Sequence, residues 1–126
     1  AKPGMRLPAH CTASGKVFLA HLPENKLQTF FKLPLRKLTE NTITQPQVLR
    51  ENLSEIKEKG YAVDSEEMEM GIRAISTPIF DQAGEVIAAI SIPGPTSRIE
   101  NENIPELASA LKQISKNISR NLGMRI

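Results

Sequence analysis

The sequence predicts an α+β domain in which an antiparallel sheet is flanked by helices, and three observations support this class. First, two apolar stretches, 72–80 and 85–92, are joined by the short turn Asp81-Gln82-Ala83-Gly84, which is typical of a hairpin. Second, the segment 46–59 has apolar residues at helical spacing. Third, apolar residues recur at the same helical spacing in a separate segment, about 104–122. These segments predict helices that pack against a central antiparallel hairpin.

Length and composition are those of a single globular domain. The chain has 126 residues, 40% of them hydrophobic and 24% charged, which is ordinary for a soluble protein. The net charge of +2 is too small to indicate a polyanionic partner. No apolar stretch approaches the roughly 18 residues that a membrane-spanning helix needs. The single cysteine, Cys11, cannot form an internal disulfide, which favours the reducing cytoplasm.

The first part of the chain reads as a loop followed by two short helices. Residues 1–9 contain two prolines and a glycine, which disfavour regular structure. Thr12 is suited to cap a helix that continues to about Leu22, and Pro23 is suited to begin a second one. The segment 32–44 is predicted to be a loop.

The middle of the chain predicts a longer helix and the strands. Pro46 suits the first helical position and Gly60 suits the position just after the last one. Residues 61–65 read as a short strand, and Pro93-Gly94-Pro95 is expected to end the last strand. That strand is apolar on both faces, so both must be covered. We expect helices on one side of the sheet and the remainder of the domain, or a ligand, on the other.

Three ordered blocks of sequence resemble one known family. Residues 60–98 read GYAVDSEEMEMGIRAISTPIFDQAGEVIAAISIPGPTSR, residues 7–20 read LPAHCTASGKVFLA, and residues 41–60 read NTITQPQVLRENLSEIKEKG. They are similar to the effector-binding domain of IclR-family bacterial transcription regulators. That family typically shows Gly-Tyr-x-x-Asp-x-Glu-Glu, Gly-x-Arg-Cys-Ile-Ala, Phe-Asp-x-x-Gly and Ala-Ala-x-Ser-x-Ser-Gly-Pro-x-Ser-Arg blocks.

The resemblance implies a GAF-like fold and a ligand sensor that controls transcription. It implies a small-molecule effector such as a carboxylate or sugar acid, assembly into dimers or tetramers, and no cofactor. In the family, a winged helix-turn-helix that binds operator DNA and the opening strands of the sensor domain come first. Neither is visible here. We therefore expect residues 1–126 to be an effector-binding domain that is incomplete on its N-terminal side.

The resemblance also implies an effector site. The helix start Ala13-Ser14-Gly15 lines the effector pocket in the family, and unpaired backbone N–H groups there can hold a small anion. On spacing alone, close packing of the small residues is the favoured interpretation, and the family resemblance shifts the balance to effector binding. Asp64 and Ser91 match family residues that hydrogen-bond the effector. The alternatives are that Asp64 is solvated or caps a turn, and that Ser91 bonds to backbone.

Two positions depart from the family pattern. Ala74 stands where the family commonly has cysteine, and Pro93 stands where it has a second serine. Both changes remove hydrogen-bonding groups from the expected pocket. The residues Ala74 and Pro93 are expected to form an apolar wall, so a larger or more apolar ligand is favoured over the smallest polar acids.

Other candidate residues have simpler interpretations. His10 beside Cys11 lacks the spacing of a zinc site, so a structural histidine is expected. The acidic run Glu66, Glu67 and Glu69 lacks calcium-loop spacing and is expected to be a solvated face. The basic residues at 112, 116 and 120 repeat every four positions without interleaved aromatic residues, so a solvated helix face is favoured over phosphate binding.

Two functions remain open from the sequence. The first is a regulatory module that binds a small organic acid. The second is a small enzyme that acts on a similar acid, with Asp64 and His10 as acid and base, although no strong catalytic constellation supports it.

Overall fold

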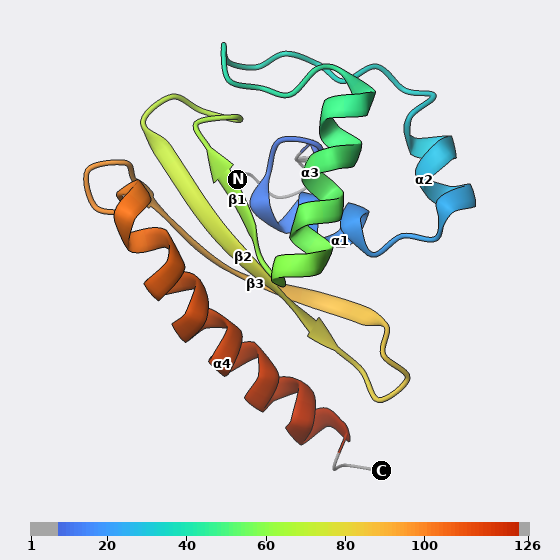
Figure 1. Ribbon diagram of the computed structural model, residues 1–126, viewed down its shortest axis with the longest axis vertical. Coiled ribbons are helices and arrows are strands. Elements are labelled where there is room, and N and C mark those ends of the chain that lie inside the picture. Colours follow the sequence, from blue (N-terminus) through green and yellow to red (C-terminus); the bar gives the residue numbers. More distant parts are fainter. Residues whose placement is uncertain (1–7, 124–126) are drawn as a thin grey trace, which may run out of the picture.

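The computed structural model describes residues 8–123 and consists of a three-stranded sheet between two layers of helix (Figure 1). The helix α4 runs along one face of the sheet, and α1 and α3 lie on the other. The elements in chain order are α1 (Ala13–Ala20), α2 (Glu24–Phe30), α3 (Pro46–Lys59), β1 (Ala62–Ser65), β2 (Ile72–Phe80), β3 (Val86–Pro95), η1 (Asn101–Asn103) and α4 (Ile104–Gly123). The predicted α+β class is confirmed.

Each strand of the sheet pairs antiparallel with the next, in the order β1-β2-β3. One expectation was wrong: β3 does not end before Pro93 but continues to Pro95, with Pro93 opposite Ala74 and Pro95 opposite Ile72. The two prolines are tolerated because β3 lies at the edge of the sheet formed by residues 8–123, where a strand can do without some backbone donors.

Both faces of the sheet are covered by helices, whereas helices were expected on one face only. On one face Ala62 packs with Val17 and Leu19 of α1 and with the apolar residues of α3. On the other face Ile75 packs with Ala108 and Leu111 of α4. The 3.6-residue period of α4 lets this single helix cover a whole face, because its apolar side chains form one stripe.

The two helices next to the candidate site begin and end as their sequences dictate. The Thr12 hydroxyl accepts a hydrogen bond from Gly15 N at 3.1 Å, which caps the start of α1. Pro46 occupies the first turn of α3, where its missing N–H is not needed. Gly60 ends α3 with φ of 85°, a left-handed conformation that strongly favours glycine. Within residues 8–123, no helix has the length and apolar character needed to cross a membrane.

Candidate functional site

The face of the sheet that α1 covers carries most of the predicted site residues. Asp64, Ala74 and Pro93 are direct cross-strand partners and form one row across β1, β2 and β3. Ser91 lies in the next row on the same face, opposite Ser76, and its hydroxyl donates to the Ser76 hydroxyl at 3.0 Å. Two-residue periodicity thus brings an acid, a hydroxyl and two apolar residues, distant in sequence, to one surface.

The start of α1 packs tightly against the segment that precedes it. A Cβ atom on Gly15 would lie 2.5 Å from Ala9 Cα and 2.5 Å from the Thr12 hydroxyl oxygen, so only glycine fits there. Ala13 is buried, and Ser14 is partly exposed. The close-packing interpretation of the small residues therefore holds for Gly15. The Gly15 N–H donates to the Thr12 hydroxyl, so an anion at this helix start would bind to the N–H groups of Ala13 and Ser14.

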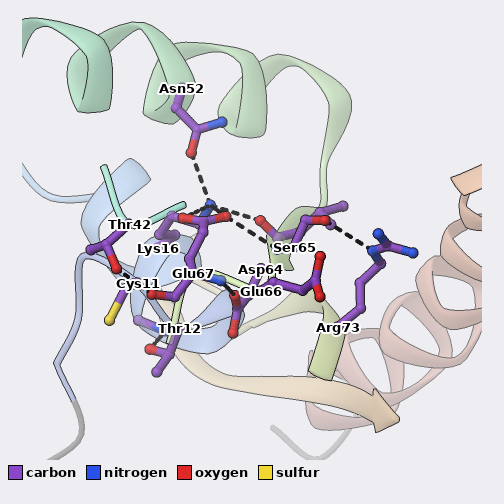
Figure 2. Close-up of polar contacts among 12 residues, drawn as sticks. Cys11, Thr12, Lys16, Thr42, Asn52, Asp64, Ser65, Glu66, Glu67 and Arg73 are labelled. Atoms are coloured by element: carbon purple, nitrogen blue, oxygen red, sulfur yellow. Dashed lines mark hydrogen bonds and ion pairs between the residues drawn. The ribbon is translucent and has the colours of Figure 1, made fainter. Parts of the chain in front are cut away.

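A buried lysine connects the start of α1 to the residues around Asp64 (Figure 2). Lys16 is only 1% exposed, and its ammonium contacts both carboxylate oxygens of Glu67 at 2.9 and 3.1 Å. It also donates to Asn52 Oδ1 on α3 at 3.0 Å and to the Val63 carbonyl of β1 at 2.7 Å. An ammonium has three hydrogens, so these acceptors satisfy it fully. Lys16 thereby ties α1, α3 and β1 together.

The backbone after β1 is folded around the same cluster. Asp64 Oδ1 accepts a hydrogen bond from Glu67 N at 2.8 Å, and Glu67 Oε2 accepts one from Ser65 N at 3.2 Å. The Thr42 hydroxyl donates to the Glu67 carbonyl from the loop before α3. Asp64 therefore caps a turn, which was one of the alternatives to effector binding. Its position depends on Glu67, and Glu67 is in turn held by Lys16.

The cluster holds two carboxylates against one ammonium. Burial raises the pKa of Asp64 above its usual value, an effect that the hydrogen bond from Glu67 N and the charge of Lys16 partly offset. Burial likewise raises the pKa of Glu67, and the attraction of Lys16 works in the opposite direction. The ion pair with Lys16 therefore offsets part of the free-energy cost of burying Glu67 beside Asp64.

The expected effector residues are brought to one face but do not line a described cavity. The four cavities described within residues 8–123 range from about 170 to 440 Å³ and have other residues in their walls. Asp64 is buried, whereas Ser91 and Pro93 are exposed on the edge strand β3. The β3 side of this surface is therefore open in this chain.

Sequence reasoning missed the buried ion pair. The run Glu66, Glu67 and Glu69 was expected to be a solvated face, and this is wrong for Glu67, which is 7% exposed. A signal was present, because a lysine follows the small residues of the helix start in one family block and the acids belong to another. His10 takes a structural contact, since its Nε2 donates to the Arg36 carbonyl at 2.7 Å.

We expect Cys11 to be unreactive in the folded chain. Its thiol is fully buried, and burial, followed by the charges of Asp64 and Glu67, raises its pKa to about 11. At pH 8 this lowers the thiolate fraction about a hundredfold relative to an ordinary cysteine, and the thiolate is the reactive form. A disulfide reagent should label Cys11 slowly in buffer and rapidly in concentrated urea. Equal rates would contradict the buried position.

Comparisons with known proteins show the family to which the chain belongs. The family of bacterial transcriptional regulator IclR C-terminal domains matches residues 1–120. The HTH-type transcriptional repressor AllR of Klebsiella pneumoniae is 37% identical over 123 residues, which cover 97% of this chain and 45% of the repressor. The chain thus spans about half the length of the curated relatives it matches. These relatives are transcriptional regulators and not enzymes, so they do not support the enzyme alternative.

Solved structures have the same fold. The Thermotoga maritima IclR structure superposes with a TM-score of 0.89 at 43% identity, covering 98% of this chain and 50% of that one. The inducer-binding domain of the Acinetobacter transcription factor PobR, solved as a double mutant with 3-hydroxybenzoic acid, superposes with a TM-score of 0.84 at 32% identity. The superposed region covers 92% of this chain and 67% of the PobR domain. From its fold and its sequence, the chain belongs to the IclR family of bacterial transcriptional regulators and corresponds to their C-terminal domain.

Proposed function

We propose that the chain is the effector-binding and oligomerisation domain of a cytoplasmic IclR-family regulator, and that it senses a small organic acid or a related catabolite. Effector binding would then change how a helix-turn-helix domain of the full regulator binds operator DNA. The observation that carries this proposal is the placement of Asp64 and Ser91 on the sheet face that also packs against the start of α1.

The groups on this face are suited to a small acid that also carries a hydroxyl. The helix start Ala13-Ser14-Gly15 would hold the carboxylate through the N–H groups of Ala13 and Ser14, because a helix start attracts anions and the Gly15 N–H already donates to Thr12. The Ser91 hydroxyl, whose single hydrogen points to the Ser76 hydroxyl in this structure, would turn to donate to the same end of the ligand. Asp64 accepts the hydrogen bond from Glu67 N and, as a carboxylate with about four acceptor positions, has capacity left for a ligand hydroxyl.

The two departures from the family pattern, Ala74 and Pro93, indicate that the rest of the ligand is apolar. Ala74 and Pro93 lie beside Asp64 in one cross-strand row and offer no hydrogen-bonding side chain. The body of the ligand would lie on this apolar wall. The inducer-binding domain of PobR, with which this chain shares its fold, was solved with 3-hydroxybenzoic acid, a small acid with an apolar ring. A ligand of that type fits the polar and apolar division proposed here.

We also infer that the chain self-associates. Three large apolar side chains, Ile87 on β3 and Ile114 and Ile118 on α4, are 51%, 51% and 36% exposed. Contact with another subunit would remove these side chains from water, which favours association. For an oligomer to transmit the signal, the effector must bind one arrangement of the subunits more tightly than another.

Substitution of the two polar residues tests the site. A thermal-shift screen of small carboxylic and sugar acids would identify a ligand, and calorimetry would then compare variants. We expect Ser91→Ala and Asp64→Asn each to weaken that ligand about ten- to a hundredfold, since loss of a hydrogen bond to a charged group costs about 1.5–3 kcal/mol. The amide oxygen that Asp64→Asn introduces would still accept from Glu67 N, so the fold should be kept.

Matched controls remove the same groups elsewhere. Ser54→Ala and Glu58→Gln change exposed residues of α3 and should leave affinity unaltered. Unchanged affinity in both Ser91→Ala and Asp64→Asn, with normal melting curves, would show that the ligand binds at another place.

A further inference from the structure

The largest of the described cavities lies away from the proposed effector site. It has a volume of about 440 Å³, which is within the usual range of roughly 300–1,000 Å³ for small-molecule sites. Its walls come from the end of α1, the end of α3, the last part of β2 and the second half of α4. The strand β1 pairs with β2 only as far as Ser76, so the edge of β2 beyond that residue is open to this cavity.

Basic side chains enter this cavity from two helices. Lys57 comes from α3, and Lys112, Lys116 and Arg120 come from α4. None of the described residues in its walls is acidic. Among residues 8–123, no carboxylate lies within ion-pair distance of these four cations. The stripe on α4 was expected to be a solvated face, but α3 places a further lysine opposite to it.

Local effects explain only some of these charges. Lys57 and Arg120 each lie in the last turn of a helix, where the helix dipole favours cations. Lys112 donates to the Lys59 carbonyl at 2.9 Å, and its stem lies over Gly60, where a Cβ would be 3.2 Å away. Lys116 has no such partner among the described residues. It follows Lys112 and precedes Arg120 by four positions, a spacing at which like charges repel on a helix.

The floor of the cavity is apolar and rigid. Pro78 and Phe80 of β2 form it, and His21 packs edge-on against the Phe80 ring at a centroid distance of 5.5 Å. His21 is itself fixed, because its Nδ1 donates to the Val17 carbonyl at 2.9 Å. The Ser119 hydroxyl accepts from Phe80 N at 3.0 Å and so holds α4 to β2 at this point.

An apolar floor with a rim of cations that have no carboxylate partner among residues 8–123 matches a ligand that has an apolar body and more than one negative charge. We propose that this cavity binds a small organic dianion, such as an aromatic or aliphatic dicarboxylate, independently of the effector site. The effector site differs in charge, because Asp64 and Glu67 together outnumber Lys16 there. A dianion should therefore prefer the cavity at α4 over the effector site.

An NMR titration of the chain with isophthalate tests the proposal. Isophthalate has an aromatic ring and two carboxylates, and isophthalamide is its uncharged counterpart. We expect saturable shifts of the Phe80, Ser115 and Ser119 amides with isophthalate and none with isophthalamide. The double variant Lys116→Gln/Arg120→Gln should weaken binding at least tenfold. The matched double variant Lys26→Gln/Lys32→Gln, which removes two exposed charges elsewhere, should bind as the wild type does.

Other outcomes would overturn the proposal. Equal weakening in the two double variants would mean a general attraction to a basic surface. Shifts centred on Ala13–Gly15 and Ser91, abolished by Ser91→Ala, would assign isophthalate to the effector site. Absence of saturation at millimolar concentration would mean that the cavity takes no such ligand. Binding that persists undiminished at about 1 M salt, where the screening length is about 3 Å, would show that the cations do not attract it.

Discussion

Replacement of Lys16 by methionine is expected to destabilise the chain by about 3–5 kcal/mol at pH 7, because removal of one partner of a buried ion pair leaves the other charge uncompensated. Glu67 is 7% exposed and would lose the ammonium that contacts both of its carboxylate oxygens. Asn52 and the Val63 carbonyl would each lose a donor as well. Methionine keeps most of the apolar stem, so the loss is electrostatic rather than a cavity effect. Urea unfolding at pH 7 measures it.

The pH dependence of this loss identifies its cause. Burial already raises the pKa of Glu67, and without Lys16 the pKa must rise further. A folded-state pKa above the unfolded value means that stability is greatest at low pH and is lost as the pH rises through the folded-state pKa. The deficit of Lys16→Met relative to wild type should therefore be smaller at pH 5 than at pH 7. A deficit that is independent of pH would argue for lost packing instead.

A double variant separates the charge from the shape of the site. Lys16→Met/Glu67→Gln removes both charges and leaves an amide that can still accept from Ser65 N. Replacement of a buried ion pair by uncharged groups is often nearly neutral, so the double variant should recover much of the stability lost in Lys16→Met. If the double variant is as unstable as the single one, an unpaired Glu67 charge is not what destabilises it.

The sequence predicts the elements of this fold well, because each is encoded by local signals. Thr12 as a cap, Pro46 in the first turn and Gly60 after the last turn of α3 all have the predicted roles. The hairpin of β2 and β3 follows from two apolar stretches around Gly84, which has φ of 82°. The end of β3 was misjudged, because a Pro-Gly-Pro segment breaks a central strand but not an edge strand, and edge position is a property of the whole sheet.

The candidate site was less predictable than the fold. Asp64, Ala74 and Pro93 were proposed from the family resemblance, and their common row depends on strand register, which only the paired strands reveal. Burial of Lys16 and Glu67 could not be read locally, since lysine and glutamate are almost always exposed unless they are paired. Their partners come from α1, α3 and the turn after β1, so the pairing is a long-range feature.

Replacement of Gly15 by alanine is expected to destabilise the chain by about 1–3 kcal/mol, towards the upper end of that range. In an open helix, alanine instead of glycine stabilises by up to about 1 kcal/mol, so the expected sign here is opposite to helix propensity. The reason is the distance of 2.5 Å between the new Cβ and Ala9 Cα. A backbone atom cannot rotate away as a flexible side chain can. The segment before α1 and the Thr12 cap must therefore shift.

The same variant tests whether the start of α1 holds the ligand. Because Thr12 caps α1 and Ala13 follows it, a shift of this turn would misplace the N–H groups proposed to bind a carboxylate. We expect Gly15→Ala to weaken the ligand found by thermal shift in addition to lowering the melting temperature. Ser14→Ala is the matched control for stability, since it changes the neighbouring residue without adding an atom near Ala9. A Gly15→Ala chain that melts as the wild type does would show that the close packing around Gly15 is absent in solution.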